Sequence, residues 1–545
     1  MSQTTTPPVS ERRQMATVGM GLAWQAQHTP DRLAIASDAG DRTFAELNAH
    51  ANQLARAMRR RGVGKSDSLG LACSNRPEFP ETLAAGLRIG VRNTPINWHL
   101  TGEEIAYILN DCEAKVFVAD ARFADACAEA AKAAPDLIAK FAVGGPIDGF
   151  ESYEDALAAE SDDDIDDPVL GRQMLYTSGT TGRPKGVNRP AAGIAADPDT
   201  PAGRDRTREQ GDDAAGASAA ETPGAYRDGD VHLCTGPAYH AAPLGISLNR
   251  PLASGATVVF MDGWSPEETL RLIQQHGVTH SHMVATMFHR LLGLPDDVKK
   301  SYDTSSLRYV IHGAAPCPVE VKKGMIEWWG PVIYEYYAAT EGGGTSVAPE
   351  DWMKKPGTVG RPRGNQVVEV WDTEGNQCKP GEIGTVYIKA PDQGRFEYYK
   401  DPDKTASAYK GNYFTLGDMG YFDEDGDLFL TGRTAELIIS GGVNIYPAEV
   451  DAVLLQHPAV ADAATVGVPN EDWGEEVKSV VQLKEGIEGT AELAAELISF
   501  TRESLAHYKC PRTVDWDPAL PRHDTGKIYR RLVRDRYWEG RARQI

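Results

Sequence analysis

The sequence predicts an α/β protein with a large N-terminal domain of several sheets and a small, mobile C-terminal α/β domain. The chain has 545 residues, which is several times the size of a typical domain, so two or more large cores are expected. The segment from Ser68, SLGLACSNRPEFPETLAAGLRIGVRNTPIN, alternates short apolar runs with an alanine-rich stretch. This alternation is typical of βαβ units around a parallel sheet. The composition changes near residue 432, which predicts domains at 1–432 and 433–545.

Several elements can be predicted along the chain. RQMLYTSGT (172–180) reads as a strand that enters a glycine-rich loop, and PAEVDAVLLQHP (447–458) reads as a helix with proline at its first position. AATVGV (463–468) and KSVVQL (478–483) are typical of strands, and TAELAAELISFTRESLA (490–506) is typical of a helix. Residues 191–230 are rich in Ala, Gly, Asp and Thr and cannot bury much surface, so we expect an exposed, flexible insertion.

Charge and composition exclude several classes of protein. The formal net charge of −22 argues against a nucleic-acid partner, because phosphate backbones require an excess of Lys and Arg. The N-terminal MSQTTTPPVSERRQ has no apolar core for a signal peptide, and no transmembrane segment is predicted, so we expect a cytoplasmic protein. The seven cysteines are odd in number and form no CxxC pair, which favours buried thiols over disulfides or zinc. A homo-oligomer stays open.

The most informative short segment is YTSGTTGRPKG (176–186). In a G-x-x-x-x-G-K-[ST] loop the lysine leads directly into a helix. Here Pro184 removes an N–H donor and Gly186 disfavours a helix start, so we predict a mobile loop and not a helix cap. Hydroxyls and glycine N–H groups suit several phosphate oxygens, and a flexible surface hairpin is the alternative. The predicted phosphate-binding residues are Thr177, Ser178, Gly179, Thr180, Thr181, Gly182 and Lys185.

With this loop, further segments form a recognisable series. They are YEYYAATEGG (334–343), NYFTLGD (412–418), DLFLTGR (427–433), ISGGVNIYP (439–447) and PRHDTGK (521–527). Their order resembles that of the acyl-adenylate-forming (ANL) superfamily, over essentially the whole chain. The motif sequences are similar to those of the acyl-CoA synthetase branch, in particular of bacterial fatty-acid and bile-acid CoA ligases. This resemblance implies that a carboxylate and ATP form an acyl-AMP and pyrophosphate, and that CoA then takes the acyl group.

The resemblance also implies the residues that serve adenylation. Lys527 would bridge the carboxylate and the α-phosphate as a compact positive charge. Glu341 would bind Mg²⁺, with Thr340 beside it on phosphate. Tyr337 would stack on adenine, although Tyr336 is an alternative. The loop from His312 would frame the adenine, and the ribose would bind a carboxylate supported by an arginine; these residues are Gly313, Ala314, Asp418 and Arg433.

The second half-reaction would use other residues. Rotation of the C-terminal domain would bring Ser440, Gly441 and Gly442 to the acyl carbonyl, where missing side chains leave a slot for pantetheine. The hinge is commonly Asp or Lys in this superfamily, and this chain has Ala435 there, which puts the pivot in doubt. His240 would stand at the mouth of the acyl pocket.

The acyl pocket is expected to include residues after His240, Val284 within the largely apolar HMVATMFHRLL (282–292), and Gly342 and Gly343, which would leave room beside the carboxylate. We therefore predict a medium- to long-chain or bulky alicyclic monocarboxylate, with an aromatic acid as the alternative.

Three other functions are alternatives to an acyl-CoA synthetase. An adenylating enzyme could pass its acyl group to a carrier-protein thiol or to a luciferase-like oxidation. A γ-phosphoryl-transferring kinase or ATPase would need Walker spacing, which is absent. A catalytically silent binding protein is disfavoured by the intact Lys185, Glu341, Asp418, Arg433 and Lys527.

Overall fold

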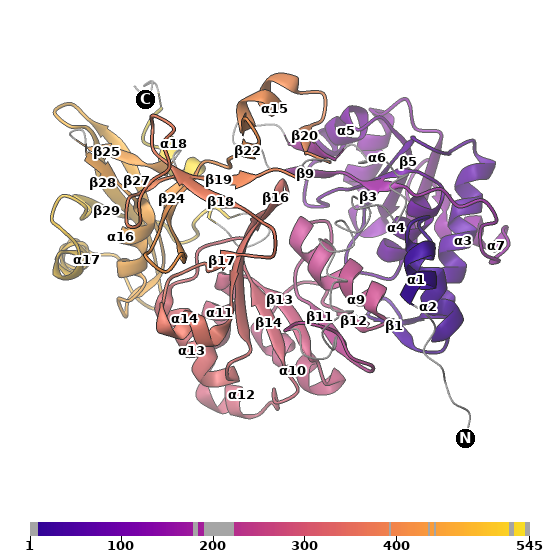
Figure 1. Ribbon diagram of the computed structural model, residues 1–545, viewed down its shortest axis with the longest axis horizontal. Helices are drawn as coiled ribbons and strands as arrows, with labels where there is room; N and C mark the ends of the chain where they lie inside the picture. The colour runs from indigo at the N-terminus through magenta and orange to yellow at the C-terminus, as the bar shows by residue number, and fades with distance from the viewer. Residues whose placement is uncertain are drawn as a thin grey trace.

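The structure is a computed structural model that describes residues 9–177, 184–189, 223–391, 394–433, 436–440, 443–522 and 528–539. It confirms the predicted mixed α/β fold with several sheets. Two large sheets and two smaller ones are built from residues up to Arg433, and a separate sheet follows from Ile438 onward. In Figure 1 this last, yellow part of the chain lies beside β18 and β24.

The first large sheet is parallel throughout and has the strand order β7-β6-β5-β3-β4-β8. It confirms the predicted βαβ unit, since β3 (Ser68–Ala72) leads through α4 (Glu78–Arg88) to β4 (Arg92–Pro95). The remaining strands are β5 (Ala114–Asp120), β6 (Ala139–Val143), β7 (Glu151–Ser152) and β8 (Arg172–Gln173). Its helices are α3 (Phe44–Arg60), α5 (Gly102–Asp111), η1 (Ala121–Phe123), α6 (Ala124–Lys132) and α7 (Tyr153–Ala158). Thr43 and Thr101 begin α3 and α5 with capping boxes, which satisfy the first free N–H groups.

The second large sheet has nine strands in the order β17-β16-β15-β14-β13-β11-β12-β1-β2. Its parallel centre consists of β1 (Leu33–Ala36), β12 (Thr257–Phe260), β11 (Val231–Cys234), β13 (His280–Met283), β14 (Tyr309–His312) and β15 (Ile333–Ala339). Antiparallel strands complete both edges, namely β2 (Arg42–Thr43), β16 (Gly342–Val347) and β17 (Arg361–Pro362).

Two helices precede the first strand of this sheet, and the others lie between its strands or follow them in sequence. The π-helix η4 (Pro243–Asn249) contacts β11 and β13, and α11 packs against α13. The other helices are α1 (Val9–Ala16), α2 (Gly21–His28), α9 (Arg250–Ser254), α10 (Pro266–His276), α11 (Ala285–Leu292), α12 (Asp296–Lys300), α13 (Val319–Trp329) and α14 (Pro349–Lys354).

Two smaller sheets lie between these and the C-terminal part. The three-stranded sheet has the order β20-β10-β9, with β9 (Leu175–Thr177), β10 (Lys185–Asn188) and β20 (Glu397–Tyr398). The other sheet has the order β21-β22-β19-β23-β24, and β18 pairs with β19. Its elements are β18 (Val368–Trp371), β19 (Gly384–Lys389), α15 (Pro402–Ala408), β21 (Tyr409–Lys410), β22 (Tyr413–Phe414), β23 (Asp418–Phe422) and β24 (Leu428–Arg433).

The C-terminal part is a small α/β unit with the strand order β26-β25-β28-β27 and with β29 on β28. The four elements predicted after residue 446 are confirmed as α16 (Pro447–Leu454), β27 (Val460–Asn470), β28 (Gly474–Leu483) and α17 (Ala491–Ser504). The other elements are β25 (Ile438–Ser440), β26 (Val443–Ile445), β29 (Thr513–Trp516) and α18 (Arg530–Asp535). β24 ends at Arg433, next to the domain boundary predicted between residues 432 and 433, which stays a prediction.

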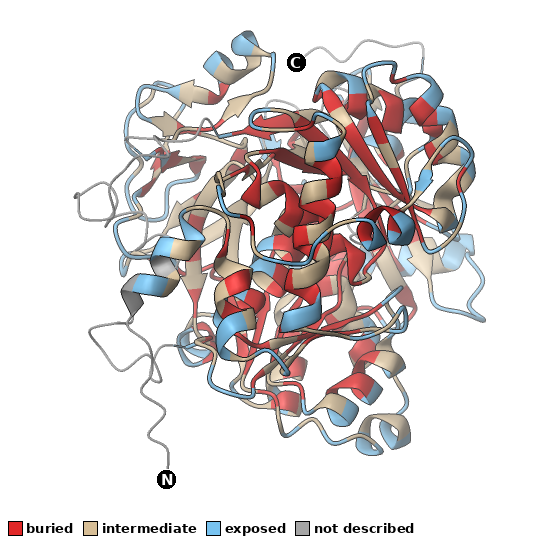
Figure 2. Cartoon of the chain, turned by 90° about the vertical axis from the view of Figure 1, so that its right-hand side faces the viewer, coloured by how far each residue is buried: buried red, intermediate tan, exposed pale blue. Residues whose placement is uncertain are grey.

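Buried residues are concentrated in the sheets and on the helix faces that pack against them (Figure 2). One apolar cluster contains residues of both large sheets, including Leu71 and Val258. All seven thiols are free, and five of them are buried.

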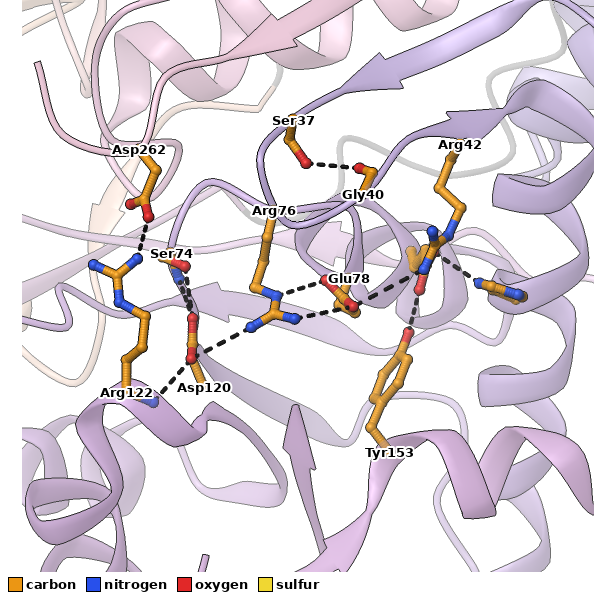
Figure 3. Close-up of polar contacts among 12 residues, drawn as sticks. Ser37, Gly40, Arg42, Ser74, Arg76, Glu78, Asp120, Arg122, Tyr153 and Asp262 are labelled. Carbon is orange, nitrogen blue, oxygen red and sulfur yellow. Dashed lines mark hydrogen bonds and ion pairs between the residues drawn. The ribbon is translucent and has the colours of Figure 1, made fainter. Parts of the chain in front are cut away.

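A chain of polar contacts also joins the two large sheets (Figure 3). Asp120, at the end of β5, accepts hydrogen bonds from the Ser74 hydroxyl at 2.6 Å and from the Arg122 N–H at 3.0 Å. The Arg122 side chain pairs with Asp262, beyond the end of β12, and Arg76 lies 3.5 Å from Asp120. These contacts link the carboxyl end of β5 in the first sheet to that of β12 in the second.

The predicted insertion at 191–230 ends earlier than expected. Residues 190–222 lie outside the described part of the chain, but residues 223–230 pack against the nine-stranded sheet. Tyr226 stacks on His280 with ring centroids 4.4 Å apart, and Asp230 is buried. The aromatic ring of Tyr226 supplies the large apolar surface that the sequence before it, from residue 191, lacks. Across the described residues, no helix is long and apolar enough to cross a membrane.

Candidate active site

The glycine-rich loop is held by a β-hairpin. β9 and β10 are antiparallel, and Thr177 pairs with Lys185 across the base of the loop. Lys185 begins a strand, which confirms that no helix starts at this lysine. The predicted mobile loop does not include Lys185, because this residue is paired in the sheet. The predicted phosphate residues Ser178, Gly179, Thr180, Thr181 and Gly182 lie outside the described residues.

Lys185 has an acidic partner that sequence analysis missed. Its ammonium group pairs with Asp401, and the second oxygen of that carboxylate accepts from the Lys404 N–H at 3.0 Å, so Asp401 also caps α15. The hydrogen bond from Lys185, with that from Lys404, lowers the pKa of Asp401. The loop lysine is therefore paired with a carboxylate from a distant segment.

Thr340 and Glu341 form the turn between β15 and β16, and the same three-stranded sheet holds this turn. Tyr398, on β20, donates a hydrogen bond to Glu341 Oε1 at 3.0 Å. Arg189, just after β10, donates to the carbonyl oxygens of Glu341 at 2.9 Å and Thr340 at 3.4 Å. Burial and the Glu341 charge raise the pKa of Tyr398, so the phenol is a hydrogen-bond donor at neutral pH. Sequence analysis missed Tyr398 and Arg189 too.

The Glu341 carboxylate fits the magnesium ligand that the resemblance implies. Oε1 accepts from Tyr398, whereas Oε2 makes no hydrogen bond to any described residue. A half-buried carboxylate oxygen of this kind is a suitable hard ligand for Mg²⁺, which usually takes one or two carboxylates besides phosphate and water.

The structure brings Tyr337, Asp418 and Arg433 together. The Tyr337 hydroxyl donates to Asp418 Oδ2 at 2.7 Å, and Arg433 Nε donates to Oδ1 at 2.9 Å. Asp418 and Arg433 face each other across β23 and β24. Burial first, and then the Asp418 charge, raise the pKa of Tyr337. Each oxygen of the Asp418 carboxylate therefore accepts one hydrogen bond already and can accept another. A ribose hydroxyl would bind to this remaining acceptor capacity.

The loop after β14 adopts a strained conformation. Ala314 has a φ of 66°, which is uncommon for a residue with a side chain. A Cβ atom at Gly313 would lie 2.5 Å from the ring of Tyr336, so glycine is required there by close packing. Of the two tyrosines weighed for adenine, Tyr337 points to Asp418, whereas Tyr336 points to His282.

The predicted acyl-pocket residues lie near the ends of the parallel strands. His240 is half-buried, precedes η4, and has its ring 4.4 Å from that of Tyr239. Val284 is buried at the start of α11.

The glycines after Glu341 do not leave open space, contrary to expectation. A Cβ atom at Gly342 would lie 2.6 Å from the Phe414 ring, and one at Gly343 would lie 3.3 Å from Gln366. Neighbouring side chains fill the volume that the missing side chains vacate. These glycines are therefore explained by packing, and they carry no argument about the size of the substrate.

Several predicted residues cannot be placed. Ala435, Gly441, Gly442 and Lys527 lie outside the described residues. Ser440 is described, and it ends β25 where that strand pairs with Gly474 of β28.

The fold and these residues define an adenylate-forming enzyme. The chain belongs to the family of AMP-binding enzymes, whose model matches residues 22–399, and the model of the C-terminal domain of AMP-binding enzymes matches residues 449–527. The predicted membership of the acyl-adenylate-forming superfamily, on its acyl-CoA synthetase branch, is confirmed. The protein is an AMP-forming acid–CoA ligase that uses ATP and CoA.

Individual relatives cover nearly the whole chain. It is 30% identical to a fatty acid–[acyl-carrier-protein] ligase of Streptomyces coeruleorubidus, over 98% of each protein. It is also 30% identical to a long-chain-fatty-acid–CoA ligase of Mycobacterium tuberculosis, over 96% of this chain and 99% of the relative.

Solved structures agree with the fold. ATP-bound MatB from Rhodopseudomonas palustris superimposes with a TM-score of 0.80 at 28% identity, over 96% of this chain and 99% of that one. The anthranilate CoA ligase AuaEII, in complex with anthranoyl-AMP, gives a TM-score of 0.83 over 96% and 97% of the two chains. At 24% identity the second comparison shows the fold alone.

Proposed function

We propose that this ligase activates a medium- to long-chain or bulky alicyclic monocarboxylate as a bound acyl-AMP and transfers it to CoA. One observation supports the assignment of roles: Lys185 and the residues that contact the Thr340–Glu341 turn belong to, or directly follow, strands of one three-stranded sheet. Lys185 leaves the glycine-rich loop on this sheet, while Tyr398 and Arg189 of the same sheet hold the Thr340–Glu341 turn. Contacts to the same sheet therefore support the assignment of Lys185 to phosphate and of Glu341 to a cation.

In the first half-reaction, a carboxylate oxygen attacks the α-phosphorus of ATP, and the bond to the bridging oxygen breaks to release pyrophosphate. Lys185 is assigned to the outer phosphates, Asp418 with Arg433 to the ribose, and Tyr337 to the adenine. Lys527 is assigned to the space between the two reacting anions, whose repulsion a positive charge relieves. Magnesium, when bound at Glu341, supplies further neutralisation of the phosphate oxygens.

In the second half-reaction, the CoA thiol loses its proton to solvent and its sulfur attacks the acyl carbonyl carbon, and the bond from that carbon to the AMP phosphate oxygen breaks to release AMP. We assign the pantetheine slot to Ser440, Gly441 and Gly442 and the pivot to Ala435. His240 is assigned to the mouth of the acyl pocket, where its side chain would change position between the adenylate-forming and the thioester-forming steps.

The acyl group and its acceptor have specific competitors. An aromatic acid is the alternative substrate, and the acyl-carrier-protein ligase among the relatives favours a carrier-protein thiol as the alternative acceptor. Both acceptors present a pantetheine arm, so the same glycine slot would serve either. Comparing CoA with a phosphopantetheinylated carrier protein in the second step separates them.

Carboxylate-dependent exchange of labelled pyrophosphate into ATP tests the first half-reaction. We expect exchange that requires Mg²⁺ and at least one acid from a panel of short, long, alicyclic, aromatic and steroid acids. Formation of ADP without exchange would instead assign the loop to γ-phosphoryl transfer. The ranking of acids gives the substrate class directly, before any acceptor is added.

Two variants test the assignment of residues to half-reactions. Lys527→Ala is expected to slow adenylation by about 10² to 10³, equivalent to roughly 3 to 4 kcal/mol, while sparing thioester formation from supplied acyl-AMP. Gly441→Leu is expected to block thioester formation more than adenylation. Equal losses in both steps would contradict the two-orientation scheme.

A further inference from the structure

Two polar side chains meet across the nine-stranded sheet next to the predicted acyl pocket. His282 lies on β13 and Tyr336 on β15, with β14 between them. The Tyr336 hydroxyl lies 3.0 Å from His282 Nε2, and the two ring centroids are 5.8 Å apart. Tyr336 can cross β14 because Gly313 follows that strand: a Cβ atom at Gly313 would lie 2.5 Å from the tyrosine ring. The absent side chain at Gly313 is therefore a condition for this contact.

The protonation of the pair follows from its surroundings. Burial lowers the pKa of His282 to about 4, so the imidazole is neutral at physiological pH. When Nε2 accepts from the tyrosine, the neutral ring carries its proton at Nδ1, and when Nε2 donates, Nδ1 is an acceptor and the phenol O–H remains a donor. His282 Nδ1 makes no hydrogen bond to any described residue, and the phenol oxygen keeps acceptor capacity. The pair thus has one donor and one acceptor left to offer.

The position of the pair ties it to the acyl pocket. His282 stands two residues before Val284, and Tyr336 stands four residues before Thr340. The Thr235 hydroxyl donates to the His282 carbonyl at 2.6 Å, which joins β13 to the segment that leads to His240. The pair therefore lies at the carboxyl edge of the parallel strands, where open α/β sheets bind their ligands.

We propose that His282 and Tyr336 form a recognition point in the acyl pocket for a hydroxyl or carbonyl group on the acyl part of the substrate. This inference rests on the proposed function, and it narrows the substrate to acids that carry such a group in addition to the reacting carboxylate. A plain hydrocarbon acid of the same shape would cover the pair and leave its donor unpaired. Sites built to hydrogen-bond a substrate group reject analogues lacking it more strongly than apolar pockets reject an added group.

The test is pyrophosphate exchange with matched pairs of acids. Each pair shares one skeleton, and one member is plain whereas the other bears a hydroxyl or keto group; linear, cyclohexane, aromatic and steroid skeletons are used. The wild-type enzyme is expected to show kcat/KM at least about tenfold higher for the polar member in one series or more, as one good hydrogen bond provides. A preference for the plain member in every series would overturn the inference.

Tyr336→Phe keeps the ring over Gly313 and removes only the hydroxyl. This variant should lower the polar-to-plain ratio about tenfold through the polar acid alone, with the KM for ATP unchanged. Tyr334→Phe is the matched control, because Tyr334 lies on the same strand and its hydroxyl makes no hydrogen bond to a described residue; its ratio should equal that of the wild type. An unchanged ratio in Tyr336→Phe would overturn the inference.

The outcomes distinguish a failure of the recognition point from a failure of the proposed function. Exchange with some acids but an unchanged ratio in Tyr336→Phe refutes the recognition point and leaves the ligase function intact. Absence of exchange with every acid refutes the proposed function, and the inference with it. Thermal melting of each variant shows whether a lost ratio reflects folding, and a variant that melts as the wild type does keeps the kinetic result decisive.

Discussion

Removing one hydroxyl group tests whether Tyr398 positions Glu341, the proposed magnesium ligand. Tyr398→Phe deletes the hydrogen bond to Glu341 Oε1, which measures 3.0 Å. It keeps the aromatic ring, whose edge-to-face contact with Phe396 has a centroid separation of 5.4 Å. The perturbation therefore changes the orientation of one carboxylate and very little of the packing.

The magnitude follows from the kind of hydrogen bond. A bond to a charged acceptor contributes about 1.5 to 3 kcal/mol, and the lower figure applies because Tyr398 is half-buried. About 1.5 kcal/mol corresponds to a roughly tenfold change in an equilibrium constant. Arg189 still holds the backbone of the turn in this variant, so the turn itself remains in place.

The assay is pyrophosphate exchange at fixed ATP and acid while free Mg²⁺ is varied. The half-saturating Mg²⁺ concentration is expected to rise about tenfold in Tyr398→Phe. Tyr413→Phe is the control, because it removes another tyrosine-to-glutamate bond, of 2.6 Å to Glu369, away from the turn. An unchanged Mg²⁺ requirement in Tyr398→Phe, or an equal shift in both variants, would refute the positioning role.

Three further outcomes are expected. Lys185→Met should raise the KM for ATP, whereas Asp401→Asn should lower it, because the nucleotide no longer competes with a carboxylate for the lysine; ATP titrations of exchange activity check both. Lys322→Met should destabilise the fold by about 3 to 5 kcal/mol, since it strands the buried Glu335 carboxylate, which Lys322 Nζ contacts at 2.6 Å; urea unfolding of this variant and of a double variant with Glu335→Leu, which should recover stability, measures it. Stability should also fall on acidification. His282 has a pKa of about 4 in the folded state and near 6.5 when unfolded. The unfolded chain therefore binds more protons between these values, and the group's contribution, complete above pH 6.5, should decrease by about 2 kcal/mol from pH 7 to pH 5. His282→Leu should make that slope shallower by this share, because His232, His280 and His312, whose pKa values burial also lowers, still contribute. An equally steep slope would contradict the assignment.

The sequence predicted those helices and strands that are determined by residues close to one another in the chain. The βαβ unit from Ser68 was predictable because apolar runs flank a helical stretch, and β10 was predictable as a non-helix because Pro184 and Gly186 disfavour a helix start. Asp418 and Arg433 came from motif resemblance, and their contact across β23 and β24 fits the roles proposed for them.

The partners of the site residues were not predictable. Asp401 and Tyr398 belong to a segment more than 200 residues from the glycine-rich loop, and nothing in FEYYKDP indicates which strand it pairs with. The prediction that Gly342 leaves room for the substrate was wrong for a related reason. A glycine in a sequence does not reveal whether its missing side chain leaves a space or whether a distant ring, here Phe414, fills it.

The three-stranded sheet also constrains how the protein can be divided and folded. Asn188 of β10 bonds to Glu397 of β20 at 2.6 Å across 209 residues of sequence. A chain that stops before Glu397 would leave β10 as an open edge strand, with unpaired N–H and C=O groups that can recruit other chains. During synthesis, the hairpin of β9 and β10 can gain β20 as its second neighbour only after most of the N-terminal domain has been made. Fragments intended for expression should therefore extend beyond Asp401, because shorter ones are expected to aggregate through this edge.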